Sequence, residues 1–167
     1  MHVSAINIIL SFTAALVLHE LGHFVAARAC RIRVTEAGLG WGPKLLSVPV
    51  FGVNYQLRLL PLGAYIRMDM DSLQKRSLSQ QLFVLLAGIG ANLVLAALAF
   101  GTFFGTINLM LAVANLFPMY QHDGWKSGVV IFRRVFGGPS PLVEWSFTLS
   151  AGLVSLVVLA RAIFSFC

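Results

Sequence analysis

The chain has 167 residues, which suits a single domain covering 1–167. Hydrophobic residues make up 58% of it and charged residues only 11%, whereas a soluble chain carries about 25% charged residues. This deficit excludes an ordinary soluble protein and indicates that much of the surface faces lipid.

The net charge is +6 at pH 7, and the basic residues are unevenly placed. Two groups lie between long apolar stretches: Arg28, Arg31, Arg33, Lys44, Arg58, Arg67, Lys75 and Arg76 form the first, and Lys126, Arg133 and Arg134 form the second. Cytoplasmic loops carry such groups under the positive-inside rule, so we expect the N-terminus outside and 28–78 inside. We expect no nucleic-acid binding, because the chain has no aromatic-basic platform or known reader motif.

Four apolar segments predict membrane-spanning helices. They cover about residues 3–27, 82–104, 107–135 and 142–166. The first, at about 1.5 Å per residue, is long enough to cross a bilayer with some tilt. The third is interrupted by polar residues near 118–124. Pro118 removes a backbone donor there and Gly124 loosens the chain, so we expect the helix to break.

The loop between the first two segments predicts a small membrane-associated sheet within about 43–68. Apolar and polar residues alternate over 53–59, which is the period of a half-buried strand. Residues 45–50 suit a partner strand with 51–52 as the turn, and 61–65 predicts a further turn into a short strand. The predicted fold class is an all-α polytopic membrane protein, with about four transmembrane helices and a small β-hairpin or sheet between helices 1 and 2.

The motif His19-Glu20-Leu21-Gly22-His23 stands near the end of the first apolar segment. Residues four apart lie on one face of a helix, so both imidazoles can reach one metal ion. Glu20 beside them can take a proton from water, and zinc suits this role because it lowers the pKa of water to about 7. The alternative is a set of ordinary polar residues on a helix surface. A charge within a membrane costs at least about 2.5 kcal/mol, so a metal ion is the better explanation.

A catalytic zinc needs a third protein ligand and one open position. The remaining candidates are His2, Glu36, Asp69, Asp71, His122, Asp123 and Glu144. Most lie at segment ends or in loops, where water solvates them. His122 and Asp123 instead interrupt the third segment, and irregular backbone at membrane depth is tolerated only inside protein or beside a water-filled cavity. A broken helix that bears an acid opposite the first helix is what a three-ligand site requires.

Three sequence blocks together resemble the site-2 protease family of intramembrane zinc metalloproteases, peptidase family M50. They are His19–His23, residues 87–92, which are similar to the AGPxxN stretch of the family, and Asn115–Pro118 with Asp123-Gly124, which are similar to its NxxP…DG motif. Residues 61–68 also resemble a loop of bacterial members. Ile89 stands where the family usually has proline. The link at 104–107 is too short for an inserted PDZ domain, so the resemblance is to a minimal form.

The resemblance implies one zinc ion held by His19, His23 and Asp123, with Glu20 as the general base. His122 lies next to the implied ligand. It is a fourth or alternative ligand, a partner of a ligand, or an interfacial histidine.

The resemblance also implies that Asn92, together with Asn115, faces the site and helps to bind the substrate or its oxyanion. Hydrogen bonding between helices is the alternative for both residues.

The predicted function is hydrolysis of peptide bonds within or near transmembrane segments, in regulated intramembrane proteolysis or the clearance of signal-peptide remnants. The expected partners are a transmembrane protein substrate and the lipid bilayer. The expected location is a bacterial inner membrane, with the active site towards the cytoplasm. An unwound substrate could add to the sheet as a strand, or the sheet serves packing alone.

Two other functions compete with proteolysis. One is a non-catalytic metal-binding scaffold or regulator; Glu20 argues against it, because metal binding alone needs only ligands. The other is a metal transporter, which would place polar ligands along a path over several helices rather than at one site.

Overall fold

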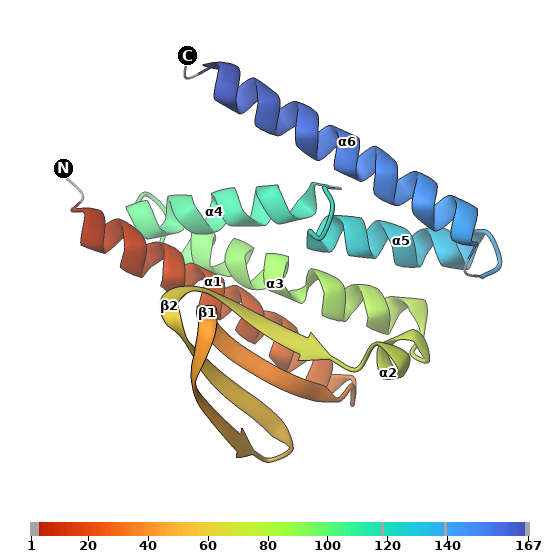
Figure 1. Cartoon of the computed structure of the whole chain (residues 1–167), viewed down its shortest axis with the longest axis horizontal. Helices are drawn as coiled ribbons and strands as arrows, with labels where there is room; N and C mark the ends of the chain where they lie inside the picture. The colour runs from red at the N-terminus through yellow and green to blue at the C-terminus, as the bar shows by residue number, and fades with distance from the viewer. Residues whose placement is uncertain (1–3, 118, 139, 166–167) are drawn as a thin grey trace.

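The computed structural model describes residues 4–117, 119–138 and 140–165, and the elements follow in the order α1, β1, β2, α2, α3, α4, α5 and α6 (Figure 1). Helix α1 covers Ala5–Ala29, and the Ser4 side chain caps it by accepting a hydrogen bond from the Asn7 backbone N–H at 3.3 Å. The buried residues of α1 form one narrow stripe at helical spacing: Ala15, His19, His23, Ala26 and Ala27. Many of the other residues of α1 are large, apolar and exposed, which suits a helix that partly faces lipid.

Two described helices are long and apolar enough to cross a membrane, α1 and α3, which covers Leu78–Leu98. Helix α4, Phe103–Leu116, is apolar but shorter, and α6 covers Pro141–Ser165. The helix in the region of the predicted second segment, about 82–104, covers Leu78–Leu98 instead. The helix starts earlier because the Ser77 side chain caps it, and it ends earlier because the chain turns over 99–102, where Gly101 has a φ of +77°.

Helices α1 and α3 pack closely through small residues. A Cβ added at Gly22 would lie 2.7 Å from the Ala87 carbonyl oxygen and 2.9 Å from the Ala91 Cβ. Small residues let apolar helices approach each other in this way. The close approach brings α3 against the side of α1 that carries His19 and His23.

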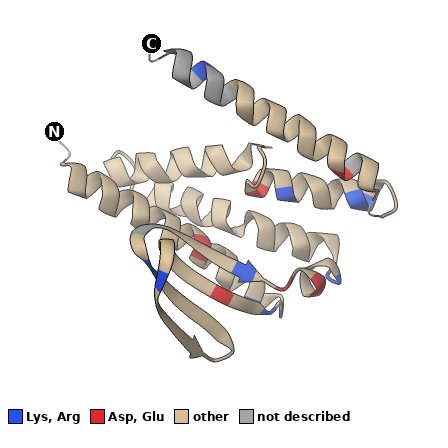
Figure 2. Cartoon of the chain, in the orientation of Figure 1, with Lys and Arg blue, Asp and Glu red and all other residues tan. Residues whose placement is uncertain are grey.

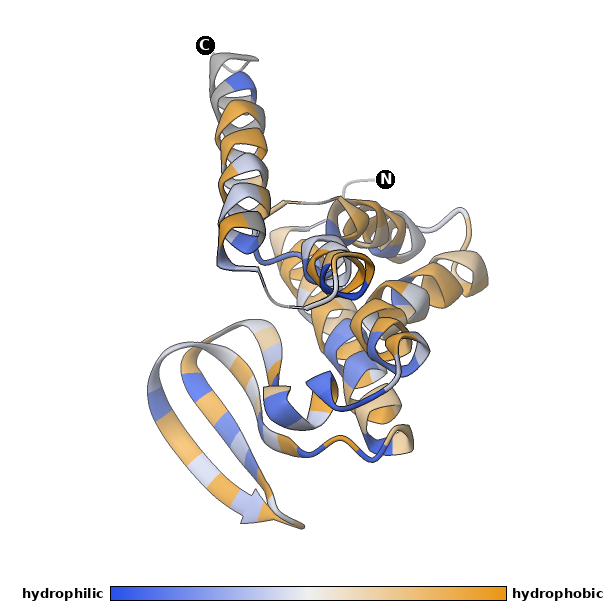
Figure 3. Ribbon diagram, turned by 90° about the vertical axis from the view of Figure 1, so that its right-hand side faces the viewer, coloured by the Kyte–Doolittle hydropathy of each residue, from blue (hydrophilic) through white to orange (hydrophobic). Residues whose placement is uncertain are grey.

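Two separate helices occupy the predicted third apolar segment. Helix α4 ends at Leu116 and α5 covers Asp123–Val135, so the polar stretch separates two helices; Pro118 lies outside the described residues. Helix α6 then leaves the other helices and points away from them (Figure 3). Near its start, the Arg133 guanidinium and the Glu144 carboxylate join α5 to α6 with a contact of 2.7 Å.

Strands β1, Val34–Val50, and β2, Val53–Met68, form an antiparallel hairpin. The predicted turn at 51–52 is confirmed, and both of its residues have positive φ angles. The hairpin folds over, because residues 36–39 pair with 64–67 on one side and with 54–57 on the other.

Two expectations about the sheet were wrong. It begins at Val34, well before residue 43, because the start of β1 pairs with the end of β2. The expected turn at 61–65 is also absent, because β2 continues through this stretch and Gly63 bends it with a φ of +88°.

The main apolar core lies where the end of α1, the sheet, α2 and α3 meet; α2 is the short helix Met70–Gln74. The core residues are Ala26, Ala27, Cys30, Ile32, Val34, Val53, Leu73, Val84 and Leu85. Charged residues gather on the sheet, on α2 and at the corner between α5 and α6, whereas α3 and α4 carry none (Figure 2). This core holds the sheet against the end of α1, beside the His-Glu motif.

Candidate metal centre

Three buried side chains from two distant parts of the chain meet at one point. His19 and His23 are one helical turn apart on α1, and their Nε2 atoms lie 3.2 Å from each other. Asp123 is the first residue of α5, and its Oδ2 lies 3.0 Å from the Nε2 of His19 and 2.9 Å from that of His23. All three residues are 5% exposed or less. Among the described residues they form the group of His, Cys and acidic side chains that could hold a metal ion.

Helix α3 fixes the position of the two imidazoles. The Nδ1–H of His23 donates a hydrogen bond to the Val84 carbonyl at 2.7 Å, which turns its Nε2 towards the meeting point. The Nδ1 of His19 is buried and has no partner among the described residues. Gly88 leaves the space that both rings occupy, since a Cβ there would overlap them and lie 2.7 Å from the His19 Nε2. A glycine is therefore required at this point of α3.

The break between α4 and α5 places Asp123. The backbone at Gly124 lies against the Leu116 carbonyl so closely that a Cβ would overlap it, so the start of α5 can approach the end of α4 only with glycine there. One helical turn further, the Lys126 ammonium lies 3.2 Å from the Asp123 Oδ1. One carboxylate oxygen thus faces the imidazoles, and the other is held by a cation.

The three ligand atoms have the spacing and chemistry of a zinc site. Two imidazoles and a carboxylate are donors that catalytic zinc accepts, with one position left open. Tetrahedral ligands at about 2.1 Å from zinc lie about 3.4 Å apart, and the observed separations are 2.9 to 3.2 Å. Because the set is buried and converges without a fourth protein ligand among the described residues, it fits a catalytic site better than a closed structural one.

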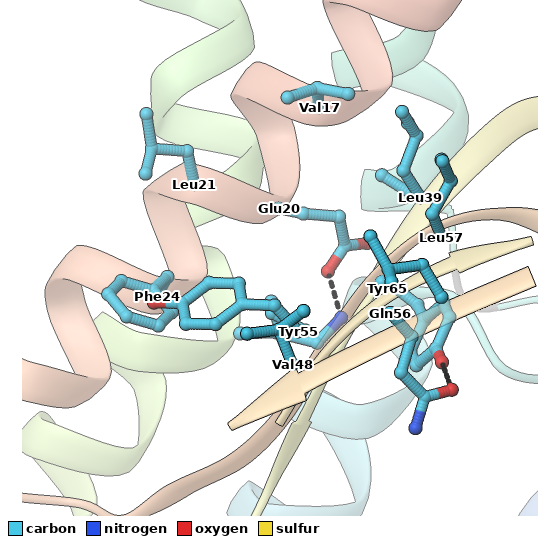
Figure 4. Close-up of a pocket in the computed structure, with 15 residues that line it drawn as sticks. Val17, Glu20, Leu21, Phe24, Leu39, Val48, Tyr55, Gln56, Leu57 and Tyr65 are labelled. Atoms are coloured by element: carbon cyan, nitrogen blue, oxygen red, sulfur yellow. Dashed lines mark hydrogen bonds between the residues drawn. The ribbon is translucent and has the colours of Figure 1, made fainter. Parts of the chain in front are cut away.

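Glu20 points from α1 towards the sheet (Figure 4). Its carboxylate accepts a hydrogen bond from the Ile66 backbone N–H at 3.0 Å. It lies at the wall of a cavity of about 420 Å³ between α1 and the sheet. The cavity wall is mostly apolar and includes Val17, Leu21, Phe24, Leu39, Val48 and Leu57. An acid beside the metal ligands therefore borders a space that can receive an apolar chain.

The structure places the other predicted residues as follows. Asn92 is fully buried on α3, and neither atom of its amide has a partner among the described residues. The Asn115 amide donates to the Leu111 carbonyl of its own helix at 3.1 Å. The His122 ring donates to the Ala114 carbonyl at 2.9 Å, so it joins α4 to α5 and lies outside the group of three ligands.

Three residues with a part in the site were not found from the sequence: Gly88, Ile66 and Lys126. A glycine inside an apolar helix does signal close approach of another group, and a lysine three residues after an acid does signal a pair on one helix face. Neither signal shows that the nearby group belongs to the site formed by His19, His23 and Asp123. The Ile66 N–H carries no sequence signal, because its role depends on how the sheet meets α1.

The comparisons with known proteins each cover part of the chain. The model of a family described as Peptidase family M50 matches residues 7–105. A candidate zinc metalloprotease of Clostridium acetobutylicum is 37% identical over 100 residues, and one of Clostridium perfringens is 39% identical over 100 residues; each match covers 55% of this chain and 30% of the relative. A candidate chloroplast membrane metalloprotease of Arabidopsis thaliana is 33% identical over 118 residues, which are 64% of this chain and 26% of the relative.

The chain spans less than a third of the length of these relatives. The family match includes His19, Glu20 and His23 but ends before Asp123, so the proximity of Asp123 to both imidazoles is a separate observation. Two apolar helices of membrane-spanning length accompany the match, as expected of an integral membrane protein. Since the family match covers more than half of the 167 residues, the chain belongs to peptidase family M50.

Proposed function

We propose that this chain is the catalytic unit of an intramembrane zinc endopeptidase of the site-2 protease type. The observation that carries the proposal is the approach of His19, His23 and Asp123 to within 3.2 Å of one another, beside Glu20 and within the apolar part of the chain. The names of the relatives, which include zinc metalloproteases and a membrane metalloprotease, support the same activity.

His19, His23 and Asp123 would hold the zinc ion. Zinc bound there supplies Lewis acidity, which polarises a peptide carbonyl and makes water easier to deprotonate. The hydrogen bond from His23 to Val84 keeps this ring in the tautomer that offers Nε2 as a ligand. Lys126 holds the second oxygen of Asp123, which keeps the carboxylate in one orientation.

Glu20 acts as the general base and then as the general acid. Its carboxylate accepts a proton from the attacking water and passes that proton to the nitrogen of the leaving amine. The Ile66 N–H binds one carboxylate oxygen and leaves the other free for proton transfer. This single anchor fixes the direction of the carboxylate, and orientation of this kind contributes strongly to catalysis.

The substrate is a transmembrane segment of another protein. A membrane helix hides its carbonyls in hydrogen bonds, so the segment must unwind before hydrolysis. The apolar cavity between α1 and the sheet is next to Glu20 and suits the side chains of such a segment. The segment adds to the sheet as a strand along 64–67, where Ile66 directs its N–H away from β1 and towards Glu20.

Asn92, whose buried amide has no partner among the described residues, is a candidate to bind the substrate carbonyl.

The chain has four membrane spans, with the interrupted α4 and α5 together forming the third. The basic residues on the sheet, just after α2 and at the end of α5 support a cytoplasmic location for these parts under the positive-inside rule. The N-terminus is then outside, and the metal centre opens towards the cytoplasmic face of a bacterial inner membrane. The physiological reaction is regulated intramembrane proteolysis or the clearance of signal-peptide remnants.

The test is Glu20→Gln in the purified, zinc-loaded chain, reconstituted with a single-pass membrane substrate. Gln keeps the size of the side chain but cannot take a proton, so cleavage should fall by at least about 100-fold. Bound zinc, measured by mass spectrometry of the metal, should stay at one ion per chain. Asp71→Asn, which changes an exposed carboxylate on α2, is the matched control and should cleave at the normal rate.

Undiminished cleavage by Glu20→Gln would refute the assigned role of this residue. Stoichiometric zinc without cleavage in the unmodified chain, against a range of membrane substrates, would favour a non-catalytic metal-binding regulator instead.

A further inference from the structure

A second cavity of about 420 Å³ lies between the start of α3 and the end of α5. Its wall contains none of the residues of the metal centre. One side of it is lined by α2, α3 and the link between them, through Gln74, Arg76, Ser77, Leu78 and Gln81; α5 lines the other side through Val130, Arg133 and Arg134. Three guanidinium groups from two parts of the chain therefore border one space, and no carboxylate belongs to its lining.

The positive charge of this cavity is only partly neutralised. Arg133 is paired, since its Nε and one terminal nitrogen donate to the two Glu144 oxygens at 2.7 Å each. Arg76 donates to the Arg31 carbonyl at 2.8 Å, which carries no net charge, and its buried Nε has no partner among the described residues. Arg134 has neither a hydrogen bond nor an ion pair within the described part of the chain. Two full positive charges thus face the cavity without an acid.

The start of α3 adds to this positive potential. Leu78 is the first residue of a helix that ends at Leu98, and the free N–H groups of a helix N-terminus carry a partial positive charge. The Ser77 side chain satisfies the Gln80 N–H at 3.4 Å. The helix end and the two uncompensated guanidinium groups therefore favour the same ligand, a compact anion with several oxygen acceptors.

The surroundings select the kind of anion. Leu78 and Val130 contribute apolar surface to the cavity wall. Charged residues gather beside the start of α3 and at the end of α5, while α3 itself carries none (Figure 2). A ligand seated here contacts both guanidinium groups and apolar helix surface, which is the chemistry of a phospholipid.

We propose that the cavity between Arg76, Arg134 and the start of α3 binds the phosphate of an anionic membrane lipid. A guanidinium group offers two parallel N–H donors that match two phosphate oxygens. Basic pockets between membrane helices on the cytoplasmic side are known to bind anionic headgroups. The bound lipid would connect α3 to the end of α5, the helix whose first residue is Asp123.

The test measures lipid binding to the purified full chain in detergent by native mass spectrometry. Phosphatidylglycerol and phosphatidylcholine with identical acyl chains are the probes, and inorganic phosphate is the soluble competitor. The chain should bind phosphatidylglycerol at least about fivefold more tightly, because each nearby basic residue contributes about that factor. Arg134→Gln, which removes an exposed side chain without a described partner, should lose about fivefold in phosphatidylglycerol affinity. Its thermal unfolding should be unchanged.

Lys75→Gln is the matched control. It removes one exposed positive charge from the same end of the molecule, and Lys75 does not line the cavity. It should bind phosphatidylglycerol like the unmodified chain. An equal loss in both variants would reduce the effect to general attraction by basic residues, and no loss in Arg134→Gln would overturn the site. Equal affinity for the two lipids would overturn the headgroup assignment. Inorganic phosphate or an acidic peptide that displaces the lipid at equal concentration would overturn the assignment to a lipid.

Discussion

The backbone N–H of Ile66 donates a hydrogen bond to the Glu20 carboxylate at 3.0 Å, and this contact joins the sheet directly to the His-Glu motif of α1. Ile66 of β2 has Ala37 of β1 as its partner on one side. Its N–H bonds to Glu20 on the other side, so this N–H belongs to the edge of the sheet that faces α1. The sheet therefore has a position relative to the proposed base that a flexible loop would not maintain. This relationship supports a role for the sheet in orienting Glu20.

Ile66→Pro should slow cleavage without removing the metal. Proline has no N–H, so the anchor of the Glu20 carboxylate is lost, and misplacement of a reacting group by about 1 Å can cost about 100-fold in rate. We expect kcat to fall about tenfold to 100-fold with zinc content unchanged, measured on a reconstituted substrate. Ile66→Val retains the N–H and is the control. A normal kcat in Ile66→Pro would show that Glu20 needs no support from the sheet.

Gly88→Ala should weaken zinc binding. The added methyl group would overlap the rings of His19 and His23, so at least one imidazole must move. We expect the zinc dissociation constant, measured by competition with a chelator, to rise at least about tenfold, as for other disturbances of ligand orientation. Gly90→Ala is the matched control on the same helix, because a Cβ there meets nothing within 4 Å. Similar zinc affinities for the two variants would contradict the packing of α3 on the ligands.

Asp123→Ala and Lys126→Gln should weaken zinc binding to different degrees. The first removes a ligand, whereas the second removes only the cation that holds the ligand at 3.2 Å. Loss of such a supporting group typically costs about 10-fold to 100-fold in metal affinity. The loss of zinc affinity in Lys126→Gln should therefore fall within that range, and the loss in Asp123→Ala should exceed it. Chelator competition measures both. Retention of zinc by Asp123→Ala would remove α5 from the metal centre.

The stability of the sheet should depend on pH through Glu36 and Tyr65. The Tyr65 hydroxyl donates to the Glu36 carboxylate at 2.5 Å, which lowers the Glu36 pKa below its usual 4.5; burial opposes this effect, and Arg67, Lys44 and Arg58 add to it. A carboxylate with a lowered pKa stabilises the fold above the usual pKa, and this stabilisation is lost as the pH falls through the lowered value. Burial raises the Tyr65 pKa above 10.0, and the bond to Glu36 adds to this effect. That contribution is complete below pH 10 and is lost at higher pH.

The melting temperature in detergent should therefore be highest between about pH 5 and 9, with loss of stability on both sides. Tyr65→Phe removes the hydroxyl and should cost about 1 kcal/mol at pH 7. It should also reduce the dependence on pH below 4.5, because Glu36 then loses its donor. Tyr55→Phe, whose hydroxyl makes no described contact with Glu36, is the control. An unchanged acid profile in Tyr65→Phe would show that other carboxylates control the unfolding.

The sequence predicts the parts of the site that depend on spacing within one helix or on a local break. The four-residue spacing of His19 and His23 requires one helix face, and Pro118 with Gly124 is a local signal for the interruption before α5. The two helices at that break do form, and Asp123 begins the second. The position of Asp123 beside both imidazoles depends on packing of α5 against α3, which no local pattern encodes.

The sequence predicts the sheet less well for the same reason. Alternation identified the hairpin around 51–52, but the pairing of 36–39 with two partners depends on the hairpin folding over. Gly63 was interpreted as part of a turn, because a glycine signal does not distinguish a turn from a bend within a strand. The roles of Gly88 and Ile66 also follow from contacts between elements that are distant in the sequence.

Asp123, the proposed third metal ligand, stands 100 residues after His23, on a helix that follows α3 and α4 in the chain. A ribosome-bound chain that has inserted its first two apolar helices therefore presents two imidazoles but no carboxylate to complete the set. Two imidazoles alone hold zinc far less firmly than a complete set of three ligands. Under the proposed function, the emerging polypeptide would thus lack hydrolytic capacity until the segment around Asp123 has been synthesised and docked against α1 and α3.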